Sequence, residues 1–209
     1  QSLVHKSYIN ENPSFTLDHN ERLEFLGDAV LELSVTEYLF KHYPRTPEGD
    51  MTNWRAALVN ATMLATLANE FGLDDYLFLS KGERKDKNHK ARQYILANAF
   101  EALIGSIYLD QGLDTARGFV EKNIVSKLPH ILKLKLYLDP KTRFQETSQE
   151  KAGITPTYRV LQEEGPDHAK NFTVGVYLNE DLIASGNGLS KQEAQVEAAL
   201  RALESKQWD

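Results

Sequence analysis

Apolar and polar residues alternate with helical spacing over residues 20–33, NERLEFLGDAVLEL. At about 100° per residue, one side of the predicted helix carries four aliphatic side chains, Leu23, Leu26, Val30 and Leu33. The opposite side carries three carboxylates within roughly 60° of one another, Glu21, Glu24 and Asp28. Clustered carboxylates repel one another unless a cation offsets them, and such hard oxygen ligands suit magnesium, manganese or calcium. The pattern predicts either a divalent-cation site or a solvated charged face.

Phe25 lies at the edge of this acidic stripe. An aromatic ring gains nothing from exposure to water, so we expect a partner to cover it. The helical pattern continues over residues 34–42 and is broken by Pro44 and Pro47.

A second informative helix is predicted over residues 93–111, QYILANAFEALIGSIYLDQ. Asn98 and Glu101 are three residues apart, so they share a face across one helical turn. Glu101 stands among Ala, Phe, Leu and Ile, where a carboxylate is costly unless it is paired, protonated or bound to a metal. We therefore expect Glu101 to belong to a functional site.

The other early segments are also typical of helices and their connections. Residues 3–10 are typical of the end of a helix, and we expect a native segment to precede this abrupt start. Further helices are expected over 53–68 and 115–138, the latter interrupted at Pro129. The basic segment 81–92, KGERKDKNHKAR, is predicted to be a loop, which is either a solvated linker or a contact for phosphates.

The pattern changes after residue 138. A helix over 140–152 precedes three predicted strands and a last helix, 157–163, 172–178, 182–188 and 190–205. The sequence thus predicts an all-α domain over 1–138, followed by a small α+β domain with the order α-β-β-β-α over 139–209.

The overall charge argues against a generally basic nucleic-acid binder. The chain of 209 residues carries a formal net charge of −6, so any nucleic-acid contact must come from local patches. The absence of cysteine excludes disulfides and thiolate metal sites. The most apolar run, Ile95–Leu109, is too short to span a bilayer and contains Glu101. We expect a cytoplasmic protein with no membrane partner.

The string NERLEFLGDAVL, residues 20–31, resembles the signature of the ribonuclease III family. The resemblance implies a homodimeric endonuclease that uses magnesium, or manganese as a substitute, and no small-molecule cofactor. It implies four metal ligands, Glu24, Asp28, Asn98 and Glu101. It implies catalytic roles for four carboxylates, Asp28, Glu101, Glu21 and Glu48, of which Glu48 helps to complete the dimeric active region. Glu48 has an alternative role as a charge facing its own helix dipole. Phe25 is expected in the dimer interface.

Position 98 departs from that family, whose usual motif Ala-Asp-x-x-Glu-Ala has Asp where this chain has Asn98. The Gly-Gly and Ser that commonly precede the motif are replaced by Asn88-His89 and by Tyr94. An amide oxygen still ligates magnesium but brings no negative charge. We therefore expect weaker metal binding, and catalysis that is slower or lost.

The α-β-β-β-α order, with Gly186, Gly188 and Ser190 at its last junction, resembles a double-stranded-RNA-binding domain. Such a domain reads the shape of A-form RNA through 2′-hydroxyl and phosphate contacts. The resemblance implies two minor-groove contacts, through Thr142, Gln145 and Gln149 and through Pro166, Asp167 and His168. It also implies a phosphate grip at the start of the last helix, through Lys191, Gln192 and Gln195.

That grip has lost two of three lysines, because the usual Lys-Lys-x-Ala-Lys reads Lys191-Gln192-Glu193-Ala194-Gln195. Each lost phosphate contact weakens salt-dependent affinity. We expect weak RNA binding by this domain alone, or else a domain that serves only structure or protein binding.

These resemblances imply two alternative functions. The first is a metal-dependent endonuclease that cleaves double-stranded RNA in RNA processing and maturation. As in the family it resembles, it would leave 5′-phosphate and 3′-hydroxyl ends with short 3′ overhangs. The second is a catalytically weakened or inactive double-stranded-RNA-binding or assembly protein with the same fold, which Asn98 and the lost lysines favour. The retained carboxylates favour the enzyme, because a scaffold gains nothing from clustered repelling charges.

Overall fold

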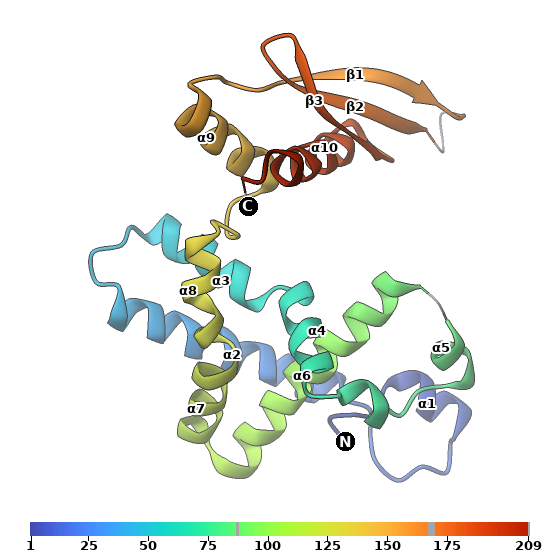
Figure 1. Ribbon diagram of the computed structural model, residues 1–209. Coiled ribbons are helices and arrows are strands. Elements are labelled where there is room, and N and C mark those ends of the chain that lie inside the picture. Colours follow the sequence, from blue (N-terminus) through green and yellow to red (C-terminus); the bar gives the residue numbers. More distant parts are fainter. Residues whose placement is uncertain (87, 167–169, 209) are drawn as a thin grey trace. The chain divides into compact units, whose positions relative to one another are not determined.

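The computed structural model describes residues 1–86, 88–166 and 170–208, and the chain forms two compact units (Figure 1). The first unit, Gln1–Lys133, contains helices and one isolated bridge between Val4 and Phe78. The second unit, Leu134–Asp209, has the order α-β-β-β-α. The predicted fold class is confirmed. The domain boundary expected after residue 138 stays a prediction.

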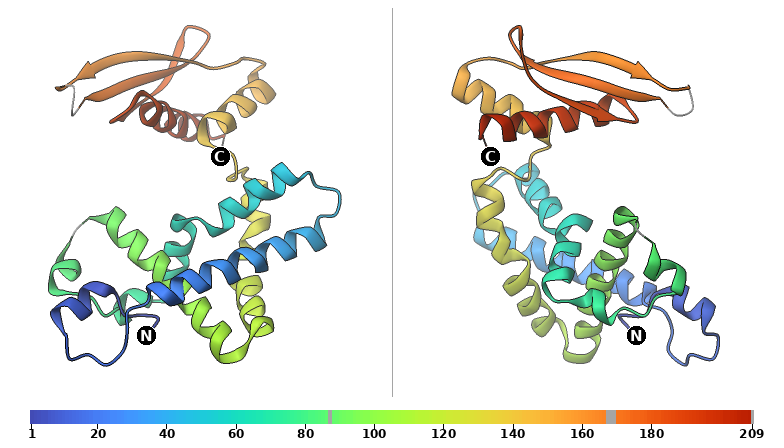
Figure 2. Two further views of the ribbon diagram at one scale, coloured as in Figure 1. Left: turned by 180° about the vertical axis from the view of Figure 1, so that it is seen from behind. Right: turned by 45° about the vertical axis from the view of Figure 1, so that its right-hand side comes forward.

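The first unit is built around two long helices, α2 (Glu21–His42) and α6 (His89–Gln111), which cross at its centre (Figures 1 and 2). The other helices of this unit, in chain order, are α1 (Lys6–Glu11), α3 (Glu48–Val59), α4 (Ala61–Glu70), η1 (Leu73–Tyr76), α5 (Lys81–Lys85), α7 (Leu113–Asn123), η2 (Val125–Lys127) and α8 (Leu128–Lys133). The largest fully buried side chains of the core come from these helices, among them Leu31, Leu58, Leu64, Phe100 and Ile131.

Several predicted elements of this unit were wrong in detail. The expected helix over 53–68 is two helices, because Asn60 adopts an extended conformation and its side chain accepts the Met63 N–H at 2.9 Å. Such a side chain satisfies a free amide and starts a new helix. The helix expected over 115–138 with an interruption at Pro129 is divided into α7, η2 and α8, of which α8 begins at Leu128 and ends at Lys133.

Side-chain caps also explain two other differences. Residues 3–10 contain the start of a helix rather than its end, because His5 caps α1 by accepting the Ser7 N–H. The basic segment 81–92 is largely helical, since Ser80 caps α5 and Asn88 caps α6. A polar side chain before a helical run favours helix initiation even in a highly charged segment.

The core face of α2 differs from the predicted one at Leu33, which is 53% exposed. The buried stripe instead includes Gly27, Val30, Leu31 and Val35. This stripe faces α6 along the crossing, so the position of the partner helix, and not the count of apolar residues, selects the buried side.

The second unit consists of a three-stranded antiparallel sheet with two helices on one face (Figure 1). Its elements are α9 (Pro140–Ala152), β1 (Thr157–Glu164), β2 (Asn171–Leu178), β3 (Asp181–Gly188) and α10 (Lys191–Lys206). The strands lie in the order β1-β2-β3. Phe144 of α9, Val176 of β2 and Leu203 of α10 meet in the core between the helices and the sheet.

Over the described ranges 1–86, 88–166 and 170–208, the structure contains no helix with the length and apolar character needed to span a membrane.

Candidate active site and RNA-binding face

Two glycines allow the backbones of α2 and α6 to touch. A Cβ atom added at Gly27 would overlap the carbonyl oxygen of Glu101 and lie 2.6 Å from its carbonyl carbon. A Cβ added at Gly105 would overlap the carbonyl oxygen of Leu23. Any side chain at either position would therefore push the helices apart, and the close crossing depends on both glycines.

The crossing brings the four predicted metal ligands together. Glu24 and Asp28 flank Gly27 on α2, and Asn98 precedes the contact residue Glu101 by one turn on α6. The Asn98 amide donates a hydrogen bond to the Glu24 carboxylate. Asp28 and Glu24 both interact electrostatically with Glu101. Two segments about seventy residues apart thus form one acidic cluster, which we define as Glu24, Asp28, Asn98 and Glu101.

Burial and mutual repulsion disfavour negative charge in this cluster. Burial raises the pKa of Glu101 from 4.5 to about 8, and the carboxylates of Asp28, Glu24 and Glu32 add to the effect. Burial also raises the pKa of Glu24, with Glu21 as the next cause. Repulsion of this kind is relieved by a cation, which would favour the ionised carboxylates.

Glu32 is a neighbour of the cluster that sequence reasoning missed. It lies four residues after Asp28, so the acidic side of α2 extends one turn further than predicted. Its carboxylate also pairs with Arg55 of α3, with 2.9 Å between Oε2 and Nε. The i, i+4 spacing of Glu24, Asp28 and Glu32 is the signal that would have revealed it.

The donor set of the acidic cluster fits a hard divalent cation, because it offers three carboxylates and an amide oxygen. In the described part of the chain, no three His, Cys, Asp or Glu side chains are already gathered closely enough to hold a metal ion. Glu24 is turned toward Asn98, and the Asp28 side chain is exposed. Closing the cluster around a cation therefore requires rotation of side chains on a backbone that is already in place.

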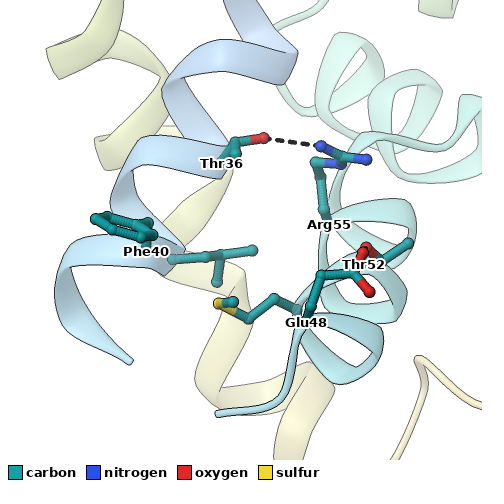
Figure 3. A pocket seen from close by; sticks show the side chains of 7 residues that line it. Thr36, Phe40, Glu48, Thr52 and Arg55 are labelled. Atoms are coloured by element: carbon teal, nitrogen blue, oxygen red, sulfur yellow. Dashed lines mark hydrogen bonds between the residues drawn. The ribbon is translucent and has the colours of Figure 1, made fainter. Parts of the chain in front are cut away.

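The two remaining predicted catalytic residues have other contacts within one chain. Glu21 pairs with Lys6, with 2.8 Å between Oε1 and Nζ. The negative charge of Glu21 also repels that of Glu24 and contributes to the raised pKa of Glu24. Glu48 accepts a hydrogen bond from the Thr52 hydroxyl at 2.8 Å. Glu48 is exposed at the start of α3 and lines a pocket between α2 and α3 (Figure 3).

This pocket, which we call the α2–α3 pocket, has a volume of about 260 Å³. Seven residues line it, Thr36, Leu39, Phe40, Glu48, Met51, Thr52 and Arg55. Arg55 links its two walls by donating a hydrogen bond to the Thr36 hydroxyl at 3.0 Å (Figure 3). Phe25, the predicted interface residue, is 82% exposed on the same helix that supplies one wall.

The predicted minor-groove residues are surface residues of the second unit. Thr142, Gln145 and Gln149 are exposed along α9. Pro166 is exposed after β1. Asp167 and His168, from the same predicted loop, lie outside the described residues.

The predicted phosphate grip has contacts of its own. Lys191 pairs with Glu163 of β1, with 2.8 Å between Nζ and Oε1. Gln195 is half-buried and accepts a hydrogen bond from Lys141 of α9, whereas Gln192 is exposed. A phosphate bound at the predicted grip would therefore compete with the Glu163 carboxylate for Lys191.

The basic segment 81–92 divides into structural and exposed cations. Arg92 pairs with Asp74 at 2.6 Å, and Arg84 donates to the Leu77 carbonyl at 3.0 Å, so both help to fix the segment. Lys81, Lys85 and Lys90 are exposed. Their exposure is compatible with both expected roles of the segment, a solvated linker and a contact for phosphates.

Comparisons with known proteins agree with both units. A family described as Ribonuclease-III-like matches residues 1–128, and one described as Double-stranded RNA binding motif matches residues 140–206. Ribonuclease 3 of Pelotomaculum thermopropionicum is 45% identical over 203 residues, which cover 97% of this chain and 84% of that protein. Ribonuclease 3 of Carboxydothermus hydrogenoformans is 46% identical over 203 residues, covering 97% and 86%.

A solved structure of the ribonuclease III nuclease domain from Campylobacter jejuni is also similar, with a TM-score of 0.50 and 41% identity. It covers 58% of this chain and 83% of that domain, and it is described as flexible in a region involved in dimer formation. The two family matches together span most of the chain, and the relatives match it over nearly its whole length. The chain belongs to the ribonuclease III family and is an endoribonuclease.

Proposed function

We propose that this chain is a homodimeric endonuclease that cleaves double-stranded RNA with magnesium, or manganese in its place, bound by the acidic cluster. The observation that carries the proposal is the meeting of Glu24, Asp28, Asn98 and Glu101 at the crossing of α2 and α6. Its expected setting is RNA processing in the cytoplasm, with no small-molecule cofactor.

The side chains of the cluster have distinct tasks in this proposal. Glu24, Asp28 and Glu101 supply negative oxygens to the cation, and Asn98 supplies a neutral one. A bound Mg²⁺ would supply Lewis-acid stabilisation of phosphate charge and would lower the pKa of a water molecule. Asp28 and Glu101 would orient a water molecule for in-line attack on phosphorus, and Glu21 would support the charge balance from the edge of the cluster. Breaking the P–O3′ bond leaves a 5′-phosphate and a 3′-hydroxyl, and paired cuts on opposite strands leave short 3′ overhangs.

A two-fold dimer is supported by the complementarity between Phe25 and the α2–α3 pocket. Phe25 is 82% exposed, and the pocket offers Leu39, Phe40 and Met51 as apolar lining. In a C2 dimer, the ring of each subunit enters the pocket of the other. Because Glu48 lines the pocket, this docking brings Glu48 of one subunit beside the acidic cluster of the other.

Replacing Phe25 with Asp is expected to convert the dimer to monomer at micromolar concentration, because a charge would enter an apolar pocket. Sedimentation velocity measures the change. Leu189→Asp is the matched control, since Leu189 is 74% exposed in the other unit and should leave the dimer intact. A fully dimeric Phe25→Asp variant would contradict this interface.

Binding of the RNA duplex is supported by the fold of the second unit, whose α9 exposes Thr142, Gln145 and Gln149 in one row. Residues at such spacing reach one groove of a duplex. The exposed lysines of the segment 81–92 add phosphate contacts from the first unit.

Incubation with a long RNA duplex, with and without Mg²⁺, tests the proposed activity. We expect metal-dependent cleavage by the parent chain and none by Asp28→Asn, which keeps the shape but removes a ligand charge. Tight duplex binding without cleavage would instead support the second candidate, a double-stranded-RNA-binding or assembly protein, which Asn98 favours.

Asn98→Asp tests the ligand role of position 98. The added charge should lower the Mg²⁺ concentration that gives half the maximal cleavage rate. Without metal, the substitution should lower the melting temperature, because Glu24 loses the N–H donor of Asn98. An unchanged Mg²⁺ dependence would show that position 98 does not ligate the cation.

A further inference from the structure

The first turns of α10 carry one lysine, Lys191, whose charge is already offset. Its Nζ lies 2.8 Å from Oε1 of Glu163 and 5.5 Å from the centre of the Phe172 ring. Gln195 lies four residues later on the same side of the helix, about 6 Å further along its axis. A phosphate that reaches this side of α10 meets a lysine shared with a carboxylate and then a neutral amide.

A second lysine reaches the same side from α9. Nζ of Lys141 donates a hydrogen bond to Oε1 of Gln195 at 2.6 Å and lies 5.3 Å from the centre of the Tyr158 ring. Both partners are neutral, because burial raises the pKa of Tyr158 to about 12. These contacts hold the ammonium group in place without cancelling its charge.

Asp139 is a carboxylate that interacts with Lys141, and it is engaged as the N-cap of α9. Its side chain accepts the backbone N–H groups of Lys141 at 3.0 Å and Thr142 at 3.2 Å, and also the Thr142 hydroxyl. The Lys141 side chain is only half-buried, and an ammonium group has three N–H donors. Donors therefore remain for a further anionic partner.

We propose that Lys141 binds an RNA phosphate and that, with Lys191, it forms a two-lysine grip joining α9 to α10. Gln195 is a positioning residue in this grip, because its amide oxygen holds the Lys141 ammonium group beside α10. The inference rests on the proposed RNA binding by the second unit and adds a phosphate-binding residue to it. It also places this contact next to Thr142, so that groove and phosphate contacts follow each other along the start of α9.

Binding of the full chain to a short RNA duplex tests the inference, with chelator present to prevent cleavage. Lys141→Gln keeps an N–H donor for Gln195 but removes the charge. We expect the dissociation constant to rise about 5- to 10-fold, and the slope of its logarithm against log salt to fall by about 0.9. Lys141→Arg keeps the charge and should restore most of the affinity and the slope.

Lys151→Gln is the matched control, because Lys151 is on the same helix and lies 5.7 Å from the centre of the Trp208 ring. We expect the salt slope of Lys151→Gln to equal that of the parent. Equal melting temperatures for Lys141→Gln and Lys151→Gln would exclude a folding defect. If the salt slope of Lys141→Gln equals that of Lys151→Gln while the slope of Lys191→Gln is reduced, Lys141 does not bind phosphate and only Lys191 does. Unchanged slopes for both Lys141→Gln and Lys191→Gln would overturn the proposed grip on α10 altogether.

Discussion

Replacing Glu101 with Gln is expected to slow cleavage of double-stranded RNA by about 10³-fold, a loss of about 4 kcal/mol of transition-state stabilisation. Glu101 is the most strongly perturbed carboxylate of the acidic cluster, and Gln has its shape without its charge. The fold should therefore persist while the cation loses a ligand. Single-turnover cleavage rates at saturating enzyme measure the effect.

Glu70→Gln is the matched control for this substitution. Glu70 forms a surface ion pair with Lys127, with 3.0 Å between Oε2 and Nζ, and such pairs contribute little to stability. Its cleavage rate should remain within about twofold of the parent. A Glu101→Gln rate equally close to the parent would remove Glu101 from the proposed metal site.

Glu101→Gln is also expected to change how the stability of the protein depends on pH in the absence of metal. The folded protein keeps the proton of Glu101 up to about pH 8, whereas the unfolded chain releases it near the ordinary pKa of 4.5. The stability from this group is therefore complete below pH 4.5 and is lost as the pH rises through 8. We expect the parent to lose stability relative to Glu101→Gln between these values, and Mg²⁺ to oppose the loss. Chemical denaturation at a series of pH values measures the free energy of unfolding of both proteins. A difference between the two free energies that stays constant across this pH range would contradict the raised pKa of Glu101.

Gly27→Ala is expected to destabilise the first unit by about 3 kcal/mol or more, because the new methyl group would overlap backbone and not a movable side chain. Separating α2 from α6 would also separate Glu24 and Asp28 from Glu101. Cleavage should therefore be lost even at temperatures where the variant is folded. Thermal unfolding and cleavage assays at a low temperature distinguish the two effects.

Gly118→Ala provides the matched control. Gly118 lies inside α7, and nothing lies within 4 Å of a Cβ added there. Alanine favours the helical conformation, so this variant should be more stable than the parent by about 0.5–1 kcal/mol. Similar melting temperatures for the two alanine variants would show that the crossing tolerates a side chain at position 27.

Local sequence signals predicted the second unit well. The helix over 140–152 was predicted with the bounds it has, and each predicted strand lies within the observed one. Asp139 before Pro140, the alternating strands and Ser190 before α10 are short-range signals that act within a few residues. The break at Asn60 and the caps of α1, α5 and α6 are also local, but apolar periodicity alone does not predict them.

The candidate chemistry of the chain could be predicted from helix geometry and residue type alone. The i, i+4 spacing puts Glu24 and Asp28 on one side of α2, and the i, i+3 spacing puts Asn98 and Glu101 on one side of α6. These relations depend only on helix geometry. The resemblance to the ribonuclease III family then predicted that the two pairs belong to one site.

How the two pairs meet, and which groups surround them, depends on the packing of α2 against α6. The contact of Gly27 with the Glu101 backbone sets the distance between the helices, and burial at that contact raises the pKa of Glu101. The approach of Lys141 to Gln195 likewise joins residues from two helices of the second unit. Periodicity within one helix cannot predict such contacts, because they depend on how closely two backbones approach and on which side chains the packing leaves exposed.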